Sequence, residues 1–491
     1  MTKNLSQITV YKGVDFFEKY ADLIAIAMAK FFYYNKRYIY KKRKVLVKMA
    51  KKIKVGFVSL GCPKNLVDTE VMLRKLAEDG YEITPDDTEA DVIIINTCAF
   101  IESAKQEAID NILDVAWLKK NRKLKGIIVT GCLAERYREE VMNEMPEIDA
   151  LLGVGSIHKI SEAVESVASG KKYVAFDDKN TSPLGGDRIV TTPEYTAYLK
   201  IAEGCDNRCT YCAIPDIRGK FRSRTIEDIV KEAKELEELG AKEVILVAQD
   251  TTRYGEDLYG RYALVDLIKK ITEETEIPWI RLLYCYPDKI TDELCEELKS
   301  NPRLLPYIDM PIQHINDRVL KKMNRRGGSA AIKSAIERLR AAVPEITLRT
   351  TVICGFPGET EEEFEELCQF IKDAKFDKLG AFPYSQEDGT PAAGFDGQLE
   401  EQVKQDRADI VMATQAEISA NLGQKKIGRM IDVLLEDYDV VAETYYGRSK
   451  ADAPDIDGKV YFSAPKGLKA GHVYKVRVTD TVDYDLFGEK F

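Results

Sequence analysis

The chain has 491 residues and a formal net charge of −10, with 45% apolar and 31% charged residues. This length is typical of about three domains. No segment reaches the roughly 18 to 20 apolar residues of a membrane span, and the stretch 21–29 lacks the residue order of a secretory signal. Composition therefore excludes a membrane protein and predicts a soluble, cytoplasmic one.

Charge is distributed unevenly along the chain. Residues 1–48 hold eleven Lys or Arg against three Asp or Glu, a net of +8, which leaves −18 for the remainder. We interpret this basic extension either as a disordered arm or mis-assigned start upstream of Met49, or as an arm that touches RNA or the ribosome. The acidic remainder lacks the clustered cations that tracking a long phosphate backbone requires.

Residues 52–170 alternate buried strands with amphipathic helices. The apolar runs KIKVGFVSLG, ADVIIINT and GIIVTG are separated by helical patterns. Continuous apolar strands between helices are typical of a parallel sheet covered on both faces. We therefore predict an N-terminal α/β domain with a parallel sheet, followed by a polar linker, rich in Pro and Gly, at 171–193.

A second series of strands and helices occupies 194–421. Six strand candidates lie between 195 and 386, and a polar helix follows from about 400 to 421. Repeated strand–helix units predict a (β/α) barrel, here incomplete, whose chemistry lies in the loops after the strands. Residues 422–491 are instead typical of short strands joined by turns, which predicts a small antiparallel β-barrel.

Three cysteines lie close together in the segment EGCDNRCTYCAIP. Cys205, Cys209 and Cys212 follow the first predicted barrel strand, on the loop at the catalytic face. Three thiolates can hold three irons of a cubane cluster and leave the fourth iron open for a ligand. The alternative is a three-cysteine zinc site with a remote fourth ligand, which the C-x3-C-x2-C spacing disfavours.

This spacing, with Tyr211 before the last cysteine, resembles the radical S-adenosylmethionine (SAM) superfamily. The resemblance implies that the open iron of a [4Fe-4S] cluster binds SAM. An electron from the cluster then cleaves SAM, and the resulting 5′-deoxyadenosyl radical takes a hydrogen from an unactivated carbon. The resemblance also implies that Tyr211 packs beside the adenine of SAM.

Three other cysteines are dispersed in the sequence. Cys62, Cys98 and Cys132 each follow directly on a predicted strand of the N-terminal domain. The carboxyl ends of parallel strands meet at one edge of a sheet, beside helix N-termini that favour anionic groups. The pattern indicates a second three-ligand cluster site, with three unrelated buried cysteines as the alternative.

Together the two cysteine sets resemble the methylthiotransferase family over residues 52–491. That family has an N-terminal cluster domain, a radical SAM barrel and a C-terminal TRAM barrel, in the order deduced above. The segments GCPKNLVDTE, AQDTTRYGEDL and FPYSQEDGTPAA resemble its RimO branch, whereas tRNA-modifying branches typically carry a GCQMN-like form at the first cysteine. Residues 1–48 depart from the family pattern.

The resemblance implies a bifunctional enzyme with two [4Fe-4S] clusters. One SAM methylates sulfur held at the Cys62, Cys98 and Cys132 cluster. A second SAM yields the radical that removes a β-hydrogen from an aspartate of the small-subunit ribosomal protein S12, and the carbon radical joins the methylthio sulfur. An external electron donor and a sulfur source are the implied partners. A tRNA adenosine methylthiotransferase and a non-catalytic iron–sulfur carrier are the alternative hypotheses.

Four further residues are weaker candidates. Gly355 and Gly358, in GFPGET, end the fifth barrel strand and resemble the family's SAM-contacting strand end, although a structural strand–helix turn is the alternative. Gln313 and His314 close the fourth strand and are expected to line the cavity as catalytic candidates. Packing or loop anchoring is the alternative for His314.

The C-terminal barrel is acidic. Residues 429–491 carry nine Lys or Arg and twelve Asp or Glu, a net of −3. Small barrels that bind nucleic acid need cations along its path, whereas an acidic surface orients a basic ribosomal protein through complementary charge. We expect this barrel to dock the protein substrate, unless its carboxylates only keep it soluble. The expected docking residues are Glu436, Asp437, Asp439, Asp480, Asp483 and Asp485.

Overall fold

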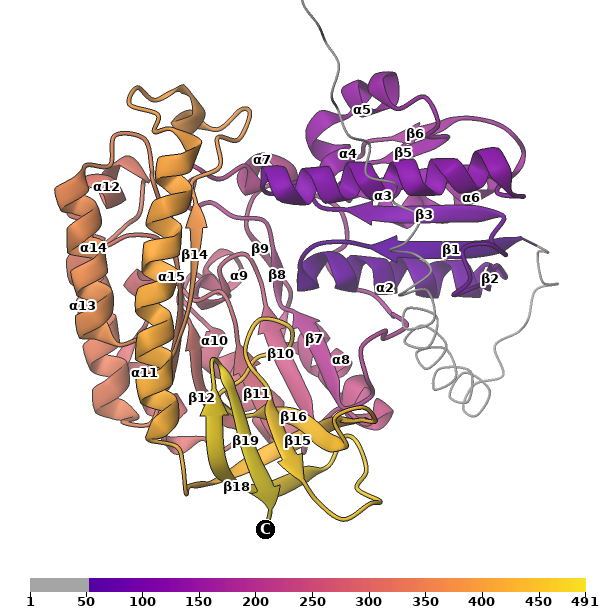
Figure 1. Ribbon diagram of the computed structural model, residues 1–491. Helices are drawn as coiled ribbons and strands as arrows, with labels where there is room; N and C mark the ends of the chain where they lie inside the picture. Colours follow the sequence, from indigo (N-terminus) through magenta and orange to yellow (C-terminus); the bar gives the residue numbers. More distant parts are fainter. Residues whose placement is uncertain (1–52) are drawn as a thin grey trace, which may run out of the picture.

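A computed structural model describes residues 53–491, so the basic extension 1–48 lies outside the described residues. Three domains follow one another along the described chain (Figure 1). Among residues 53–491, none of the helices combines the length and the apolar character needed to cross a bilayer.

The N-terminal domain contains a six-stranded parallel sheet in the order β2-β1-β3-β4-β5-β6. Its central strand β3 is buried along its whole length, because alternate side chains pack against helices on opposite faces: Ile93 and Ile95 against α3, Val92 and Ile94 against α2 and α6. Figure 1 shows α3 and α2 on the two faces. The elements are β1 (Lys54–Ser59), α2 (Pro63–Glu78), β2 (Glu82–Ile83), β3 (Val92–Thr97), α3 (Glu102–Asn121), β4 (Gly126–Gly131), α4 (Cys132–Tyr137), α5 (Glu139–Glu144), β5 (Ala150–Leu152), η1 (Val154–Lys159), α6 (Ile160–Ala168) and β6 (Tyr173–Ala175).

The sixth strand lies inside the range 171–193 that the sequence predicts as a linker. β6 pairs in parallel with β5, with Ala150 opposite Tyr173. It is a short edge strand whose Val174 is exposed, so it lacks the continuous apolar run that marks the central strands. The sheet therefore extends further along the chain than predicted, and the connecting segment begins after residue 175.

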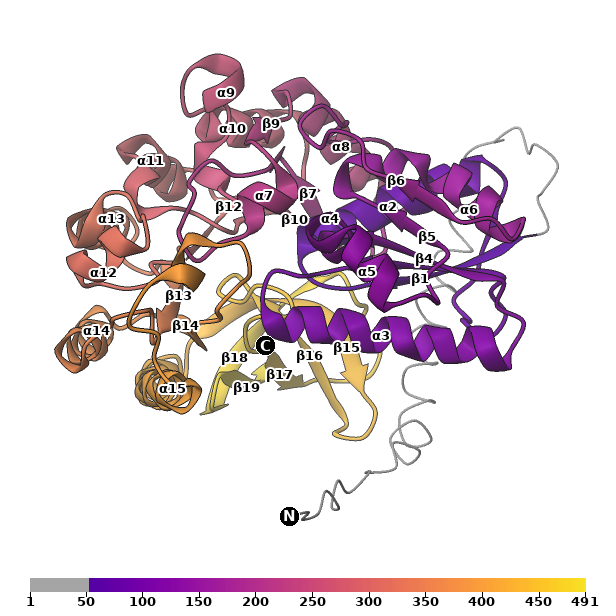
Figure 2. The ribbon, with the colours of Figure 1, turned by 90° about the horizontal axis from the view of Figure 1, so that it is seen from above.

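The second domain is the predicted incomplete barrel. Six parallel strands follow the order β14-β13-β12-β11-β10-β7, and within the described residues β7 and β14 do not pair with each other. Figure 2 shows the helices in an arc outside these strands. The strands are β7 (Thr196–Lys200), β10 (Glu243–Val247), β11 (Trp279–Leu282), β12 (Leu304–Asp309), β13 (Thr347–Cys354) and β14 (Lys378–Pro383).

One barrel helix, α8, begins and ends where the sequence predicts. The Thr225 hydroxyl accepts a hydrogen bond from the amide of Asp228, and Gly240 ends the helix with φ of 110°. Such caps satisfy the backbone groups that a helix end leaves unpaired. The remaining elements are β8 (Ala202–Glu203), α7 (Ile214–Arg218), β9 (Arg222–Ser223), α8 (Ile226–Leu239), η2 (Thr251–Arg253), α9 (Glu256–Tyr259), α10 (Leu264–Glu274), η3 (Pro287–Lys289), α11 (Asp292–Ser300), α12 (Asp317–Lys322), α13 (Gly328–Ala342), α14 (Glu361–Ala374), η4 (Pro391–Gly394) and α15 (Glu401–Gln424).

The C-terminal domain is a closed five-stranded barrel in the order β15-β16-β17-β19-β18. Four of its pairings are antiparallel as predicted, but β17 and β19 pair in parallel, with Val460 opposite Leu486. The parallel pairing was not predicted because the last strand, β19, was not recognised from the sequence. The strands are β15 (Met430–Asp439), β16 (Thr444–Ser449), β17 (Val460–Ser463), β18 (Val473–Val482) and β19 (Asp485–Lys490).

The C-terminal barrel packs against the inner face of the (β/α) sheet. Leu434 and Ala453 belong to one apolar cluster with inner-face residues such as Tyr307, and Val67 of α2 joins the same cluster. Polar contacts reinforce the junction, because the Tyr307 hydroxyl donates to Asp457 at 2.7 Å. All three domains therefore meet around the concave side of the sheet, where the candidate site lies.

Candidate active site

The three dispersed cysteines lie at one edge of the N-terminal sheet. Cys62 precedes α2, Cys98 follows β3, and Cys132 is the first residue of α4, directly after β4. Because β1, β3 and β4 are adjacent and parallel, all three cysteines sit at the carboxyl edge. The predicted placement of this first trio (Cys62, Cys98 and Cys132) is confirmed, and its ligand role stays a prediction.

A close approach of two loops brings Cys62 and Cys98 together. Gly61 has φ of 86°, and a Cβ built on it would lie 2.6 Å from the Cβ of Cys98 and 3.0 Å from its Sγ. Only glycine fits both this backbone conformation and this distance. Asn65 holds the same junction, since its side-chain amide donates to the carbonyl of Leu60 at 2.7 Å and lies 3.3 Å from the carbonyls of Asn96 and Thr97.

The second trio (Cys205, Cys209 and Cys212) lies on the loop after β8, as predicted. The C-terminal end of α12 anchors this loop: the amide of Thr210 donates to the carbonyl of Met323 at 3.0 Å. Asn324 donates to the carbonyl of Arg208 at 2.9 Å. The loop is thus fixed by hydrogen bonds to the segment at the end of α12.

The cysteine thiols of both trios need a bound cation to lose their protons. Burial raises the pKa of the Cys98 thiol to about 12 and that of the Cys205 thiol to about 11. Burial also raises the pKa of Cys132 and Cys212. Such thiols stay protonated at neutral pH, whereas metal ligands must be thiolates, so iron has to supply the charge that favours the thiolate form.

The positions of the cysteine side chains in space bear on whether each trio would bind one metal ion or an iron–sulfur cluster. Among residues 53–491, no three His, Cys, Asp or Glu side chains are grouped as ligands of one metal ion would be. Cysteines that hold an iron–sulfur cluster bind different irons, so their sulfurs need not converge on one point. The ligand roles of both trios therefore stay a prediction.

Arg218 connects the two trios. It ends α7, six residues after Cys212, and its guanidinium lies 3.5 Å from the Sγ of Cys132. It also donates to Asp68 at 2.6 Å and to Asn65 at 2.9 Å. Its side chain is only 3% exposed, so the contact of this residue with Cys132 of the first trio is buried and held by a defined set of partners.

His314 is placed differently from the expected cavity-lining position. Its side chain is fully buried, with Nε2 3.4 Å from the carboxylate of Glu359. Its Nδ1 accepts a hydrogen bond from the amide of Asn316 at 3.0 Å. These contacts favour the loop-anchoring alternative for His314. Gln313 has φ of 71° and its backbone pairs with β13 at Thr351 and Ile353, so its catalytic role stays a prediction.

The two glycines of GFPGET form a turn against neighbouring segments. Gly355 has φ of 75°, and a Cβ there would lie 2.5 Å from Lys404 of α15. The amide of Gly358 donates to the carbonyl of Gly397 at 2.7 Å. These contacts account for the glycines structurally and leave SAM contact as a prediction. Tyr211 packs beside this turn, next to the cluster that includes Phe356.

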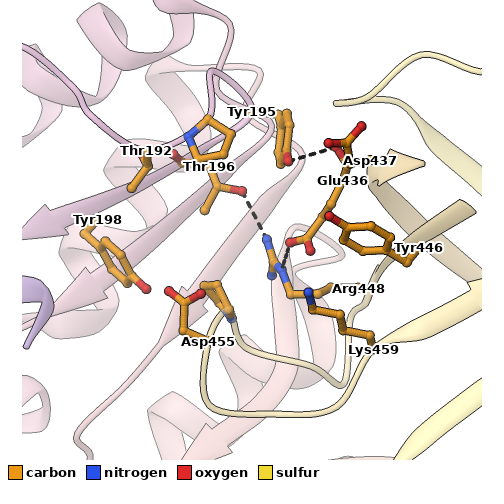
Figure 3. Close-up of a pocket in the computed structure, with 12 residues that line it drawn as sticks. Thr192, Tyr195, Thr196, Tyr198, Glu436, Asp437, Tyr446, Arg448, Asp455 and Lys459 are labelled. Carbon is orange, nitrogen blue, oxygen red and sulfur yellow. Dashed lines mark hydrogen bonds and ion pairs between the residues drawn. The ribbon is translucent and has the colours of Figure 1, made fainter. Parts of the chain in front are cut away.

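A cavity of about 280 Å³ lies elsewhere, between the start of β7 and the C-terminal barrel (Figure 3). Arg448 projects into it but is fully engaged: it contacts Glu436 at 2.6 Å, Glu243 at 2.7 Å and Thr196 at 3.1 Å. None of the six candidate cysteines lines it. This cavity belongs to the domain junction rather than to the candidate active site.

Comparisons with known proteins match each domain in turn. The uncharacterized protein family UPF0004 matches residues 54–153, the radical SAM superfamily residues 199–371, and the TRAM domain residues 427–490. The "Ribosomal protein uS12 methylthiotransferase RimO" of Clostridium botulinum (strain Eklund 17B) is 49% identical over 441 residues, covering 89% of this chain and 98% of the relative. The chain belongs to the RimO family of radical SAM methylthiotransferases.

Two further comparisons agree with this family. The protein of the same name from Thermoanaerobacter sp. (strain X514) is 49% identical and covers 89% of this chain and 99% of the relative. The radical SAM methyltransferase TsrM from Kitasatospora setae, solved with cobalamin and a [4Fe-4S] cluster, has a TM-score of 0.50 at 14% identity, over 70% of this chain and 77% of that chain. The latter likeness concerns the fold alone.

In this RimO-family chain, sequence reasoning missed the residues that join the two cysteine sites. Asn65 and Arg218 are buried polar residues with partners in both the N-terminal domain and the barrel. Asn65 stands within the quoted segment GCPKN, so its position next to Cys62 was an available signal. Arg218 lies in no motif, and only the folded structure reveals its contact with Cys132.

Proposed function

We propose that this chain adds a methylthio group to the β-carbon of an aspartate in ribosomal protein uS12. The observation that carries the proposal is the buried contact of Arg218, at the end of the helix that follows the second trio, with Cys132 of the first trio. Two sites that act on one carbon atom must lie close together. The 49% identity to proteins named as uS12 methylthiotransferases supports the same acceptor.

Cys205, Cys209 and Cys212 would hold the [4Fe-4S] cluster that binds SAM, and Cys62, Cys98 and Cys132 would hold a second one. Bound and reduced, the SAM site supplies the radical that activates the substrate carbon. The chain itself positions the two sites and excludes water: Cys132, Cys205 and Cys209 are each 5–7% exposed. Tyr211, Gly355 and Gly358 would contact SAM, and an external electron donor and sulfur source complete the reaction.

We further propose that the acidic C-terminal barrel docks the basic protein substrate. The structure narrows the set of docking residues. Glu436 is bound by Arg448 at 2.6 Å and is therefore part of the domain junction. The remaining docking candidates are Asp437, Asp439, Asp480, Asp483 and Asp485.

A competition assay tests the proposed acceptor. Anaerobically reconstituted enzyme, SAM and reductant are offered purified uS12 and bulk tRNA at equal concentrations, and both products are analysed by mass spectrometry. We expect a methylthio group on one aspartate of uS12 and none on tRNA. Methylthiolated adenosine with unmodified uS12 would overturn the proposal in favour of the tRNA alternative, and failure to cleave SAM would favour the iron–sulfur carrier.

A further inference from the structure

Lys64 is a buried cation that extends from the N-terminal domain to the barrel. It follows Cys62 by two residues, in the first turn of α2, and is 6% exposed. Its Nζ lies 3.4 Å from the centroid of the Tyr284 ring and 3.5 Å from the carbonyl oxygen of Ala248. Ala248 follows β10 and Tyr284 follows β11, so the ammonium lies at the carboxyl ends of the barrel strands.

This ammonium lacks a counterion, unlike the other cations around it. Lys200 and Arg218 share the carboxylates of Asp68 and Glu203. Within residues 53–491, no carboxylate lies within 4.0 Å of the Lys64 Nζ. An ammonium has three donors, and the partners of Lys64 are the Ala248 carbonyl at 3.5 Å and the Tyr284 side chain. A buried charge is costly without a partner of opposite sign, so this position is prepared for an anion.

The aromatic side of this anion site is held rigidly. Tyr284 adopts φ of 61°, in the left-handed region that residues with a Cβ rarely enter. Its amide donates to the carboxylate of Asp309 at 3.0 Å, and Asp309 pairs with Arg349 at 2.8 Å. Backbone strain of this kind persists where surrounding contacts enforce it and is typical of functional sites. The Tyr284 side chain stabilises the cation through its ring face.

Building on the proposed function, we propose that Lys64 binds the side-chain carboxylate of the substrate aspartate. That carboxylate is bonded directly to the β-carbon that reacts. An ammonium placed between Cys62 and the strand ends of the barrel would therefore hold this carbon between the two cysteine trios. Positioning of this kind contributes to catalysis by fixing the reacting atoms in place. Lys64 is thus a specificity-determining residue that selects an acidic acceptor.

Two other anions compete as explanations. The carboxylate of SAM is one, but a second buried cation, Arg325, lies beside the second trio, 4.0 Å from the Sγ of Cys209, and forms no ion pair with a carboxylate of residues 53–491. The thiolates of the first trio are the other, because Lys64 is close to Cys62 in sequence. Both alternatives predict that Lys64 does not distinguish aspartate from asparagine in the substrate, which makes that distinction the deciding measurement.

The test measures binding of two fluorescein-labelled uS12 loop peptides, one with the target aspartate and one with asparagine. Reconstituted full-length enzyme with SAM and without reductant is titrated by fluorescence anisotropy, as wild type, Lys64→Met and Lys64→Arg. We expect wild type to prefer aspartate by about tenfold or more, the neutral variant to bind both peptides equally, and Lys64→Arg to keep part of the preference. The Kd for SAM should not change.

A matched control removes a lysine from the same domain at the opposite edge of its sheet. Lys119 pairs with Asp149 near the end of α3, and Lys119→Met should retain the preference for aspartate. Equal weakening of both peptides by Lys64→Met, or an unchanged preference, would overturn the inference. Equal binding of both peptides by the wild-type protein would also overturn the inference, and this result does not depend on whether any variant folds. If wild type modifies uS12 in spite of either outcome, the proposed function survives and only the role of Lys64 fails.

Discussion

The two cysteine sites are built in opposite ways. Cys205, Cys209 and Cys212 occupy a single loop of eight residues, whereas the first trio is assembled from the ends of three strands. In the first trio the register of the sheet brings the chain together, with Ser59 opposite Asn96 and Thr97 opposite Gly131. A local site can be recognised from spacing alone, but a dispersed site can be recognised only after the strands have been placed.

The two cysteine sites are also held in place by different contacts. The second trio is held by hydrogen bonds between its loop and the residues at the end of α12, one from a backbone amide and one from the Asn324 side chain. The first trio depends on the absence of a side chain at Gly61 and on buried polar contacts of Asn65 and Arg218. Substitutions outside the cysteines should therefore disturb the first trio more readily than the second.

The largest effects should separate the two sites by function. Cys209→Ala should abolish reductive cleavage of SAM to 5′-deoxyadenosine, because the proposed SAM-binding cluster would lose a ligand. Cys98→Ala should still cleave SAM but form no methylthiolated product. Chromatography of 5′-deoxyadenosine and mass spectrometry of uS12 measure the two reactions separately. Normal formation of methylthiolated product by Cys98→Ala would show that the first trio is not needed for the reaction and would contradict the proposed difference between the two sites.

A glycine substitution should selectively damage the dispersed site. Gly61→Ala places a Cβ 2.6 Å from the Cβ of Cys98, so the two loops must separate and iron should be lost from the first trio only. Gly170→Ala is the matched control, because Gly170 also has a positive φ, 74°, but no atom within 4 Å of the added Cβ. The control should lose only about 1–3 kcal/mol of stability and keep all its iron. Equal iron contents in the two variants would refute the packing argument.

Arg218→Met should destabilise the junction between the two sites. Removing one partner of a buried ion group leaves Asp68 and Glu203 with Lys200 alone, which costs about 3–5 kcal/mol in comparable cases. Denaturant unfolding of the reconstituted protein measures the loss. Arg340→Met is the control: this exposed arginine donates to the carbonyl of Lys375 and should change stability by no more than about 0.5 kcal/mol. Similar losses in both variants would show that the junction has no special role.

Much of the fold was predictable because its central strands are continuous apolar runs. β1, β3 and β4, and the six barrel strands, follow from such runs, and so does the placement of all six cysteines. The short strands β2, β5 and β6 were missed because two or three residues carry no periodicity. The roles of Asn65, Arg218 and Lys64 depend on contacts between residues far apart in sequence, which no local pattern encodes.

The smallest effect concerns substrate docking, where both cysteine sites should respond equally. Asp437→Lys with Asp439→Lys should lower kcat/KM for uS12 several-fold without changing SAM cleavage, since each exposed charge pair contributes about 0.2–1 kcal/mol. The effect should shrink as salt rises, because surface charges are screened. Measuring kcat/KM at low and high ionic strength checks this. An unchanged value at low salt would indicate that these carboxylates only keep the barrel soluble.

The most direct test of the account is the iron content of the variant in which Cys205, Cys209 and Cys212 are all replaced by Ala. Two independent four-iron clusters correspond to about eight irons in the anaerobically reconstituted wild-type chain. The account predicts that the triple variant retains about half of this iron, with matching sulfide, because the first trio is assembled by a different domain. Loss of nearly all the iron would contradict the central claim that the two cysteine sites form separately.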